Sequence, residues 1–182
     1  MKKTLSIVSI GLLLVSCGGS ITPVDTTNNN TPNTTKKDQS IGSKKRVTEE
    51  SFGSLSLGQK PSEVVKILGE PESKGKKQMQ AATGTSVQDW NYPAKGLTIT
   101  MEFVGSNQNV HMIRATEPCK FATARGIKIG SAETAVKKAY AKEASKHGSG
   151  GDSFLVGSLY DGINFTFKNG MVSEIVLGVT SE

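Results

Sequence analysis

The residues best placed to do chemistry stand near the start of the chain, where Cys17 closes the run Leu14-Val15-Ser16-Cys17. Lys2 and Lys3 precede it, followed by a short apolar stretch from Leu5 to Val15. A basic start, an apolar centre and a small residue before the cut are typical of an export signal. The stretch is shorter than the roughly 20 apolar residues that span a bilayer. We therefore expect it to be removed, with the thiol of Cys17 as a lipid-attachment site.

This run resembles the signal of bacterial lipoproteins, in which Leu, a small or aliphatic residue and a small residue precede Cys. The resemblance implies removal of residues 1–16 as a signal peptide and acylation of Cys17 through its sulfur, with palmitate among the chains. Two or more acyl chains hold a protein stably on a membrane, whereas one does so only marginally. Gly18 lacks the acidic side chain that retains some lipoproteins at the inner membrane. The expected location is the outer membrane where two membranes exist, and otherwise the outer face of the cell membrane. The alternative is an ordinary secretory signal.

Residues 18–46 are rich in Asn, Thr, Ser, Gly and Pro and carry few large apolar side chains. Such a segment cannot bury enough surface to offset the entropy of ordering. We expect residues 17–50 to be a lipid-anchored, disordered tether, whose coil dimensions place the next domain on the order of 30 Å from the bilayer.

The net charge of +6 is concentrated outside the expected domain. Two lysines leave with the signal, and five basic against two acidic residues give the tether +3. Residues 47–182 then hold 15 basic and 14 acidic side chains, a net of +1. A nearly neutral domain argues against a nucleic-acid partner. The tether's charges either contact an anionic surface or keep the tether soluble.

Catalytic patterns are weak elsewhere in the sequence. His111 and His147 are the only histidines, and neither has a companion pattern for acid-base catalysis. His111 alternates with apolar neighbours and is expected on the exposed face of a strand, while His147 lies in a glycine-rich loop. Cys119 is expected either to be buried or to pair with another molecule. No spacing suggests a metal site, so we expect no enzyme and no cofactor.

An internal repeat organises residues 51–182, because residues 55–69 align with residues 127–140. Each copy has a glycine turn and then apolar residues at helical spacing, Val64 and Leu68 in the first and Val136 and Tyr140 in the second. Pro61 suits the first turn of the first helix. In the second copy, Ser131 is expected to cap the helix.

Alternating apolar and polar residues predict strands after each helix. They lie at 87–92, 96–103 and 110–114 in the first copy, and at 154–160, 162–168 and 171–177 in the second. Asn169-Gly170 predicts a tight hairpin, because both positions tolerate positive φ, and a looser loop is expected from Gly105 to Asn109. The predicted fold is therefore α+β, with two tandem helix-plus-antiparallel-sheet repeats at 51–116 and 117–182.

The order of these elements, with Leu57-Gly58, Val64 and Leu68-Gly69-Glu70-Pro71, resembles the tandem repeats of the beta-lactamase inhibitor protein family. It resembles equally the small lipoprotein of the outer-membrane barrel-assembly machinery. The resemblance covers Ser51 to Gly178, and the second copy departs from it where Tyr140-Ala141-Lys142 replaces the Leu-Gly-x-Pro exit. It implies one concave surface that grips a protein partner.

Three aromatic residues are candidates for protein contact. Trp90 and Tyr92 share one face of a strand, and Tyr160 is expected at the matching place in the second copy. Such side chains often anchor interfaces, although Trp90 and Tyr92 can instead pack in the core. The sequence predicts a lipid-anchored, non-catalytic protein-binding or scaffolding module of the cell envelope. The alternatives are an inhibitor of a secreted or periplasmic hydrolase such as a beta-lactamase, or an accessory subunit of an outer-membrane assembly complex.

Overall fold

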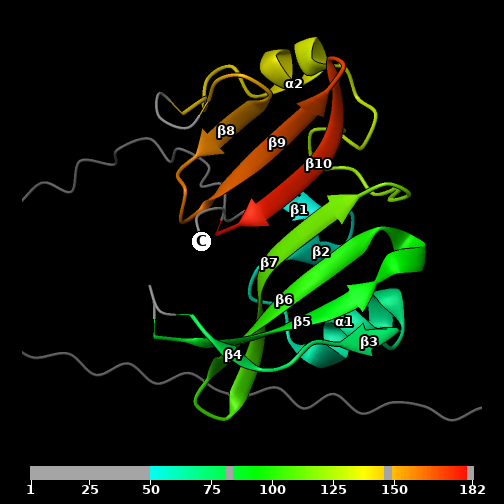
Figure 1. Ribbon diagram of the computed structural model, residues 1–182, viewed down its shortest axis with the longest axis vertical. Coiled ribbons are helices and arrows are strands. Elements are labelled where there is room, and N and C mark those ends of the chain that lie inside the picture. Colours follow the sequence, from blue (N-terminus) through cyan, green and yellow to red (C-terminus); the bar gives the residue numbers. More distant parts are fainter. Residues whose placement is uncertain (1–49, 81–83, 146–148, 180–182) are drawn as a thin grey trace, which may run out of the picture. The chain divides into compact units, whose positions relative to one another are not determined.

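The computed structural model describes residues 50–80, 84–145 and 149–179 (Figure 1). Within these residues, strands greatly outnumber helices. The elements are β1 Ser51–Phe52, β2 Leu55–Ser56, α1 Pro61–Leu68, β3 Ser73–Lys74, β4 Gln78–Met79, β5 Ser86–Tyr92, the 3-10 turn η2 Pro93–Lys95, β6 Leu97–Val104, β7 Asn107–Thr116, α2 Glu133–Ala139, β8 Ser153–Gly157, β9 Gly162–Lys168 and β10 Met171–Gly178.

One antiparallel sheet contains most of these strands. Its order is β3-β5-β6-β7-β10-β9-β8, and β4 pairs with β5 off this path. The two-residue strands β1 and β2 form a separate small sheet. At the far edge of the sheet, the outer side of β8 has backbone partners. Ala144 bridges to Val156, and the amide of Ser145 donates to Leu155 O. Covering an edge in this way removes a row of unpaired backbone groups.

The prediction of an α+β fold with two helix-plus-sheet repeats is wrong. The described residues form a β-rich fold with a single continuous main sheet, and its two α-helices contain only eight and seven residues. β7 and β10 come from the two predicted halves, yet they are paired neighbours, with Arg114 opposite Val176 and Ile113 opposite Leu177. Alternation reveals which face of a strand is buried, but it does not say which strand lies next to it. Pairing β7 with β10 satisfies two strand edges that separate sheets would have exposed.

The two turns for which the sequence made a prediction are both tight. Asn169 and Gly170 have φ values of 54° and 71° and connect β9 to β10, with Lys168 opposite Met171, so this predicted hairpin is confirmed. The turn between β6 and β7 is shorter than predicted. Val104 pairs with Asn107, which leaves only Gly105 and Ser106 in the turn. The polar residues from Asn107 onward are part of β7 because they continue the ladder with β6.

The helix predictions are partly confirmed. Pro61 begins α1, and the carboxylate of Glu63 accepts the Lys60 N–H at 2.7 Å, which satisfies one free donor of the first turn. The capping role predicted for Ser131 is wrong. α2 is preceded by Ala132, and the Oγ of Ser131 accepts the Lys128 N–H at 3.0 Å instead. A serine side chain can form this local turn as readily as a cap.

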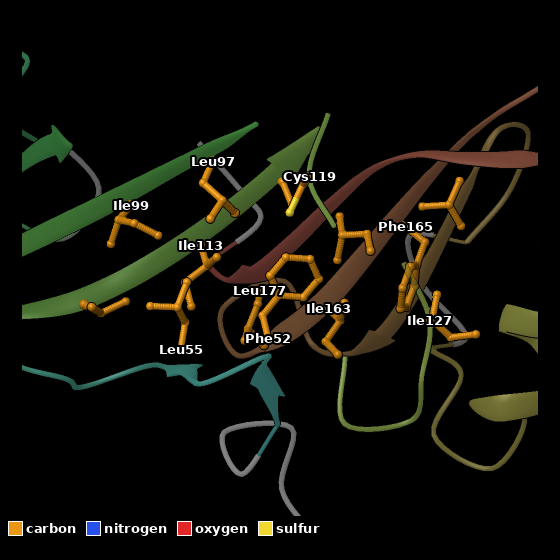
Figure 2. Packing of buried hydrophobic residues seen from close by; sticks show 14 of the residues in the cluster. Phe52, Leu55, Leu97, Ile99, Ile113, Cys119, Ile127, Ile163, Phe165 and Leu177 are labelled. Atoms are coloured by element: carbon orange, nitrogen blue, oxygen red, sulfur yellow. The ribbon is translucent and has the colours of Figure 1, made fainter. Parts of the chain in front are cut away.

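A single hydrophobic core lies on one face of the sheet, and Figure 2 shows part of it. Leu97, Ile99 and Ile113 from the first half pack in the same cluster as Ile163 and Phe165 from the second. The buried residues of both helices belong to this cluster; they are Val64 and Leu68 of α1 and Val136, with the adjoining Tyr140, of α2. Both helices therefore cover the same face of the sheet, which leaves the other face with a different chemistry.

Candidate binding surface

Cys17 lies outside the described residues, so its role in lipid attachment stays a prediction. The same holds for the tether up to residue 49 and for His147. In the part of the chain that the structure describes, no helix has the length and apolar character needed to span a membrane.

Trp90 and Tyr92 lie in the core, with exposed fractions of only 4% and 1%. The hydroxyl of Tyr92 donates to Gly69 O at 3.1 Å, and burial together with nearby Glu70 raises its pKa to about 12. The ammonium of Lys74 sits 4.1 Å from the ring centre of Trp90. Both aromatic side chains therefore pack in the core, which is the alternative to protein contact. They offer little exposed area to a partner.

Tyr160 is 73% exposed. It lies in the turn between β8 and β9 rather than in a strand, because β8 ends at Gly157. The Oγ of Ser158 accepts the N–H groups of Tyr160 and Asp161, at 3.3 and 3.1 Å, which orders the turn. Of the three predicted contact residues, Tyr160 presents its ring to solvent, and its contact role stays a prediction.

His111 is more buried than its alternating pattern predicted, with a side chain only 14% exposed. Its Nδ1 lies 3.2 Å from a carboxylate oxygen of Glu102 on β6. A register shift between Thr100 and Met101 displaces the pairing at this point, which the sequence pattern did not reveal. Cys119 is 5% exposed, which confirms the first of its two predicted states, and burial raises its pKa. Among residues 50–80, 84–145 and 149–179, no three His, Cys, Asp or Glu side chains gather as metal ligands.

The face of the sheet away from the helices is largely polar. Side chains alternate between faces along each strand, so the residues that alternate with core residues lie on this second face. We call it the polar face; its residues include Asp89, Asn91, Thr98, Thr100, Glu102, Arg114, Thr116, Ser153, Asn164, Thr166 and Glu174, together with His111, which falls at a register shift and contacts Glu102. Three apolar side chains, Met112, Leu155 and Val176, also belong to it by register and are buried outside the main core cluster.

Cross-strand contacts hold many of these polar side chains in place. Thr100 donates its hydroxyl to Asp89 at 2.7 Å, and Arg114 donates to Glu174 at 2.8 Å. Ser153 donates its hydroxyl to Asn164 at 2.7 Å at the other end of the sheet. Paired side chains lose less rotamer freedom on binding than free ones. The polar face is therefore an array of donors and acceptors whose orientations are held by cross-strand contacts.

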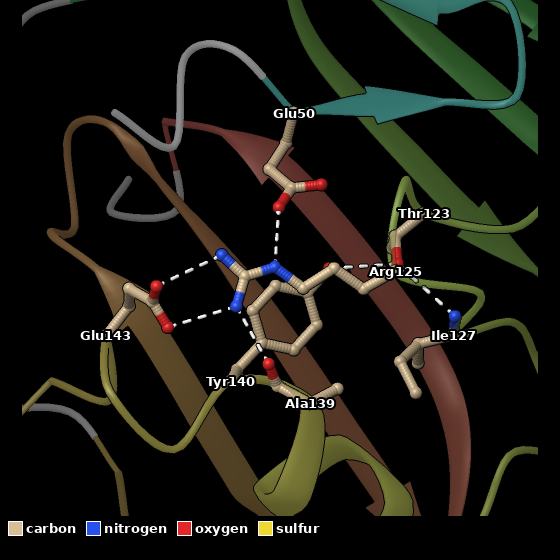
Figure 3. Close-up of polar contacts among 7 residues, drawn as sticks. All are labelled: Glu50, Thr123, Arg125, Ile127, Ala139, Tyr140 and Glu143. Atoms are coloured by element: carbon tan, nitrogen blue, oxygen red, sulfur yellow. Dashed lines mark hydrogen bonds and ion pairs between the residues drawn. The ribbon is translucent and has the colours of Figure 1, made fainter. Parts of the chain in front are cut away.

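A second polar cluster surrounds Arg125, as Figure 3 shows. Its guanidinium donates two bonds to Glu143, at 3.0 and 3.1 Å, one to Glu50 at 3.1 Å and one to Ala139 O at 2.7 Å. It also lies 4.4 Å from the ring centre of Tyr140. The hydrogen bond to Glu143 raises the pKa of Arg125, and the same bond lowers the pKa of Glu143.

This Arg125 cluster joins the start of the described chain to the end of α2. Glu50 is only 5% exposed, so its charge is held inside the protein by Arg125. The hydroxyl of Tyr140 donates to Thr123 at 2.9 Å beneath it, and burial raises the pKa of Tyr140 to about 12. Sequence patterns do not reveal this cluster, because its carboxylates lie 75 and 18 residues from Arg125. Its contacts are those of a structural support.

The polar face and the exposed turn at Tyr160 are therefore the candidate surfaces for the predicted contact with a protein. The register brings them together, because Gly162 at the end of the turn lies opposite Gly178, and Gly178 opposite Met112. Comparison with protein-family models, with curated proteins and with solved structures found no match for this chain.

Proposed function

We propose that this protein is an exported, lipid-anchored module of the cell envelope that binds a protein partner without catalysing a reaction. The observation that carries the proposal is the polar face, with its cross-strand pairs Asp89–Thr100, His111–Glu102 and Arg114–Glu174. The paired strands of the sheet fix the positions of these groups, and their mutual contacts fix their orientation. Such preorganisation favours recognition of another folded surface.

The chemistry of this face suits a partner that offers both donors and acceptors. Arg114 is 44% exposed on its side chain, so it can turn part of its fork toward a partner. Asp89 is exposed on the neighbouring strand pair. Tyr160 stands in the turn next to this face and adds the kind of aromatic contact that is common at interfaces. A surface that mixes polar groups with some apolar side chains is typical of non-obligate protein–protein interfaces.

The lipid anchor is the second part of the proposal. Attachment at Cys17 and a long tether would keep the domain at the membrane while leaving it free to meet its partner. Replacing Cys17→Ser is expected to abolish incorporation of labelled fatty acid and to release the protein from the membrane fraction. Persistent labelling of the variant would contradict this part alone.

Site-directed photo-crosslinking in cells tests the binding part. A photoreactive phenylalanine analogue would replace either Asp89 or Thr116, two exposed positions of the polar face. The matched control carries the analogue at Lys138, an exposed position of α2 on the other side of the sheet. We expect a discrete adduct with a second protein from the two polar-face positions and not from Lys138. Equal adducts from all three positions, or none from the polar face, would refute this assignment.

A further inference from the structure

Two clefts adjoin where the chain leaves β7. One has a volume of about 350 Å³ and the other about 400 Å³, and Pro118, Cys119 and Lys120 line both of them. The first reaches Leu68 at the end of α1, and the second reaches Asn169 in the turn between β9 and β10. We call the pair the double cleft.

The double cleft concentrates positive charge. Lys95 and Lys120 line its first part, and Lys120, Lys128 and Lys168 line its second, against a single described acidic residue, Glu117. Four lysines and one glutamate give +3 here, whereas residues 47–182 together carry only +1. Among the described residues, none of these four lysines takes part in an ion pair. They come from four separate segments of the chain, so the tertiary structure brings their charges together.

Apolar side chains line the space between these charges. Ile67, Leu97 and Phe121 do so in the first part, and Ile129 and Met171 in the second. Met171 is 45% exposed, so its side chain offers apolar surface to a ligand in the second part. A ligand that fits must therefore combine negative charge with apolar surface along the length of both clefts.

We propose that the double cleft binds an acidic, extended segment of another protein, with its carboxylates near the lysines and its apolar side chains against Phe121 and Met171. An extended peptide alternates its side chains, so acidic and apolar residues in alternation meet both features. A single small anion would reach one or two of the lysines and leave the apolar lining uncovered. None of the residues that line the double cleft is among those named for the polar face, so the two proposals can fail independently.

Fluorescence anisotropy with the full-length chain in a neutral detergent tests this site. The probe is a labelled synthetic hexapeptide in which glutamate and leucine alternate, and its control is the matching glutamine–leucine peptide. We expect only the acidic peptide to bind, and binding to weaken as salt is added. The double variant Lys128→Gln, Lys168→Gln should weaken it about tenfold, as the loss of two partly exposed charge pairs predicts.

Matched variants decide whether the effect is local. The pair Lys138→Gln, Lys142→Gln removes the same charge from exposed positions that do not line the clefts and should leave binding unchanged. Arg114→Ala on the polar face should also leave it unchanged. Equal weakening by both lysine pairs, equal binding of the glutamine peptide, or full displacement by millimolar inorganic phosphate or by anionic lipid vesicles would each overturn the proposal. Circular dichroism confirms that each variant is folded.

Discussion

Arg125 makes four hydrogen bonds to three separate residues. It donates to one oxygen of the nearly buried Glu50 carboxylate, to the partly exposed Glu143 and to a backbone carbonyl at the end of α2. A guanidinium suits this position because its planar fork presents several donors at fixed angles. The cost of removing it lies chiefly in Glu50, whose carboxylate would stay inside the protein without its partner.

Replacing Arg125→Ala is expected to lower the free energy of unfolding by about 2–4 kcal/mol, since it leaves a buried charge and a carbonyl unpaired. Urea unfolding followed by circular dichroism measures this change. Lys137→Ala serves as the control, because its ion pair with Glu133 is exposed and within one helix. That control should cost about 0.5 kcal/mol or less. Similar losses for both variants would show that Arg125 is an ordinary surface residue.

Glu143 gives the Arg125 cluster a pH dependence. Its hydrogen bond from Arg125 lowers its pKa in the folded protein. The pair therefore contributes its full stability above the unfolded pKa, about 4.3, and loses it as the pH falls through the folded value. The difference in unfolding free energy between wild type and Glu143→Gln should be constant near pH 7 and shrink below about pH 4. A difference that grows toward acid pH would contradict this account.

At the scale of elements, glycines with positive φ set the tight connections, for two different reasons. Gly170 has open space around the position of a Cβ, so its requirement is conformational only. At Gly96, which follows η2, a Cβ would lie 2.3 Å from Thr116 O and 2.6 Å from Cys119 N. The Gly96 carbonyl also accepts the Thr116 N–H at 2.9 Å. This close approach holds the end of β7 against the start of β6.

Gly170→Ala should cost about 1 kcal/mol, the strain of a left-handed alanine. Gly96→Ala carries the same strain and also pushes away the backbone of Thr116 and Cys119. We therefore expect it to lower the free energy of unfolding by more than about 3 kcal/mol. Thermal and urea unfolding of the two variants provide the comparison. If both cost the same, the close contact at Thr116 does not constrain the chain.

At the scale of the whole molecule, the pairing of β7 with β10 makes one structure of two similar halves. The core runs through both, so neither half has a hydrophobic cluster of its own. Trp90, the single tryptophan of the chain, lies on β5, whereas Phe165 lies on β9, four strands away in the sheet. The fluorescence of Trp90 in one half should therefore detect a loss of stability that originates at Phe165 in the other half.

Phe165 is fully buried, and Phe165→Ala should destabilise the protein by about 3–5 kcal/mol. Because the fold is continuous, Trp90 fluorescence should show the whole loss, with a midpoint that coincides with that from far-UV circular dichroism. Tyr160→Ala, an exposed change in the same half, should shift the midpoint by little. A Trp90 transition that stays at the wild-type midpoint would mean that the halves unfold separately.

The sequence by itself determined the local features of this protein. The alternation in residues 162–168, the Asn169-Gly170 turn and the start of α1 at Pro61 depend on near neighbours or on residue type. The tertiary structure alone decided the pairing of β7 with β10, the burial of His111 beside Glu102, the Arg125 cluster and the lysines of the double cleft. Each of these joins residues far apart in the chain, and a pattern of apolar and polar residues records which face is buried but not which distant segment covers it.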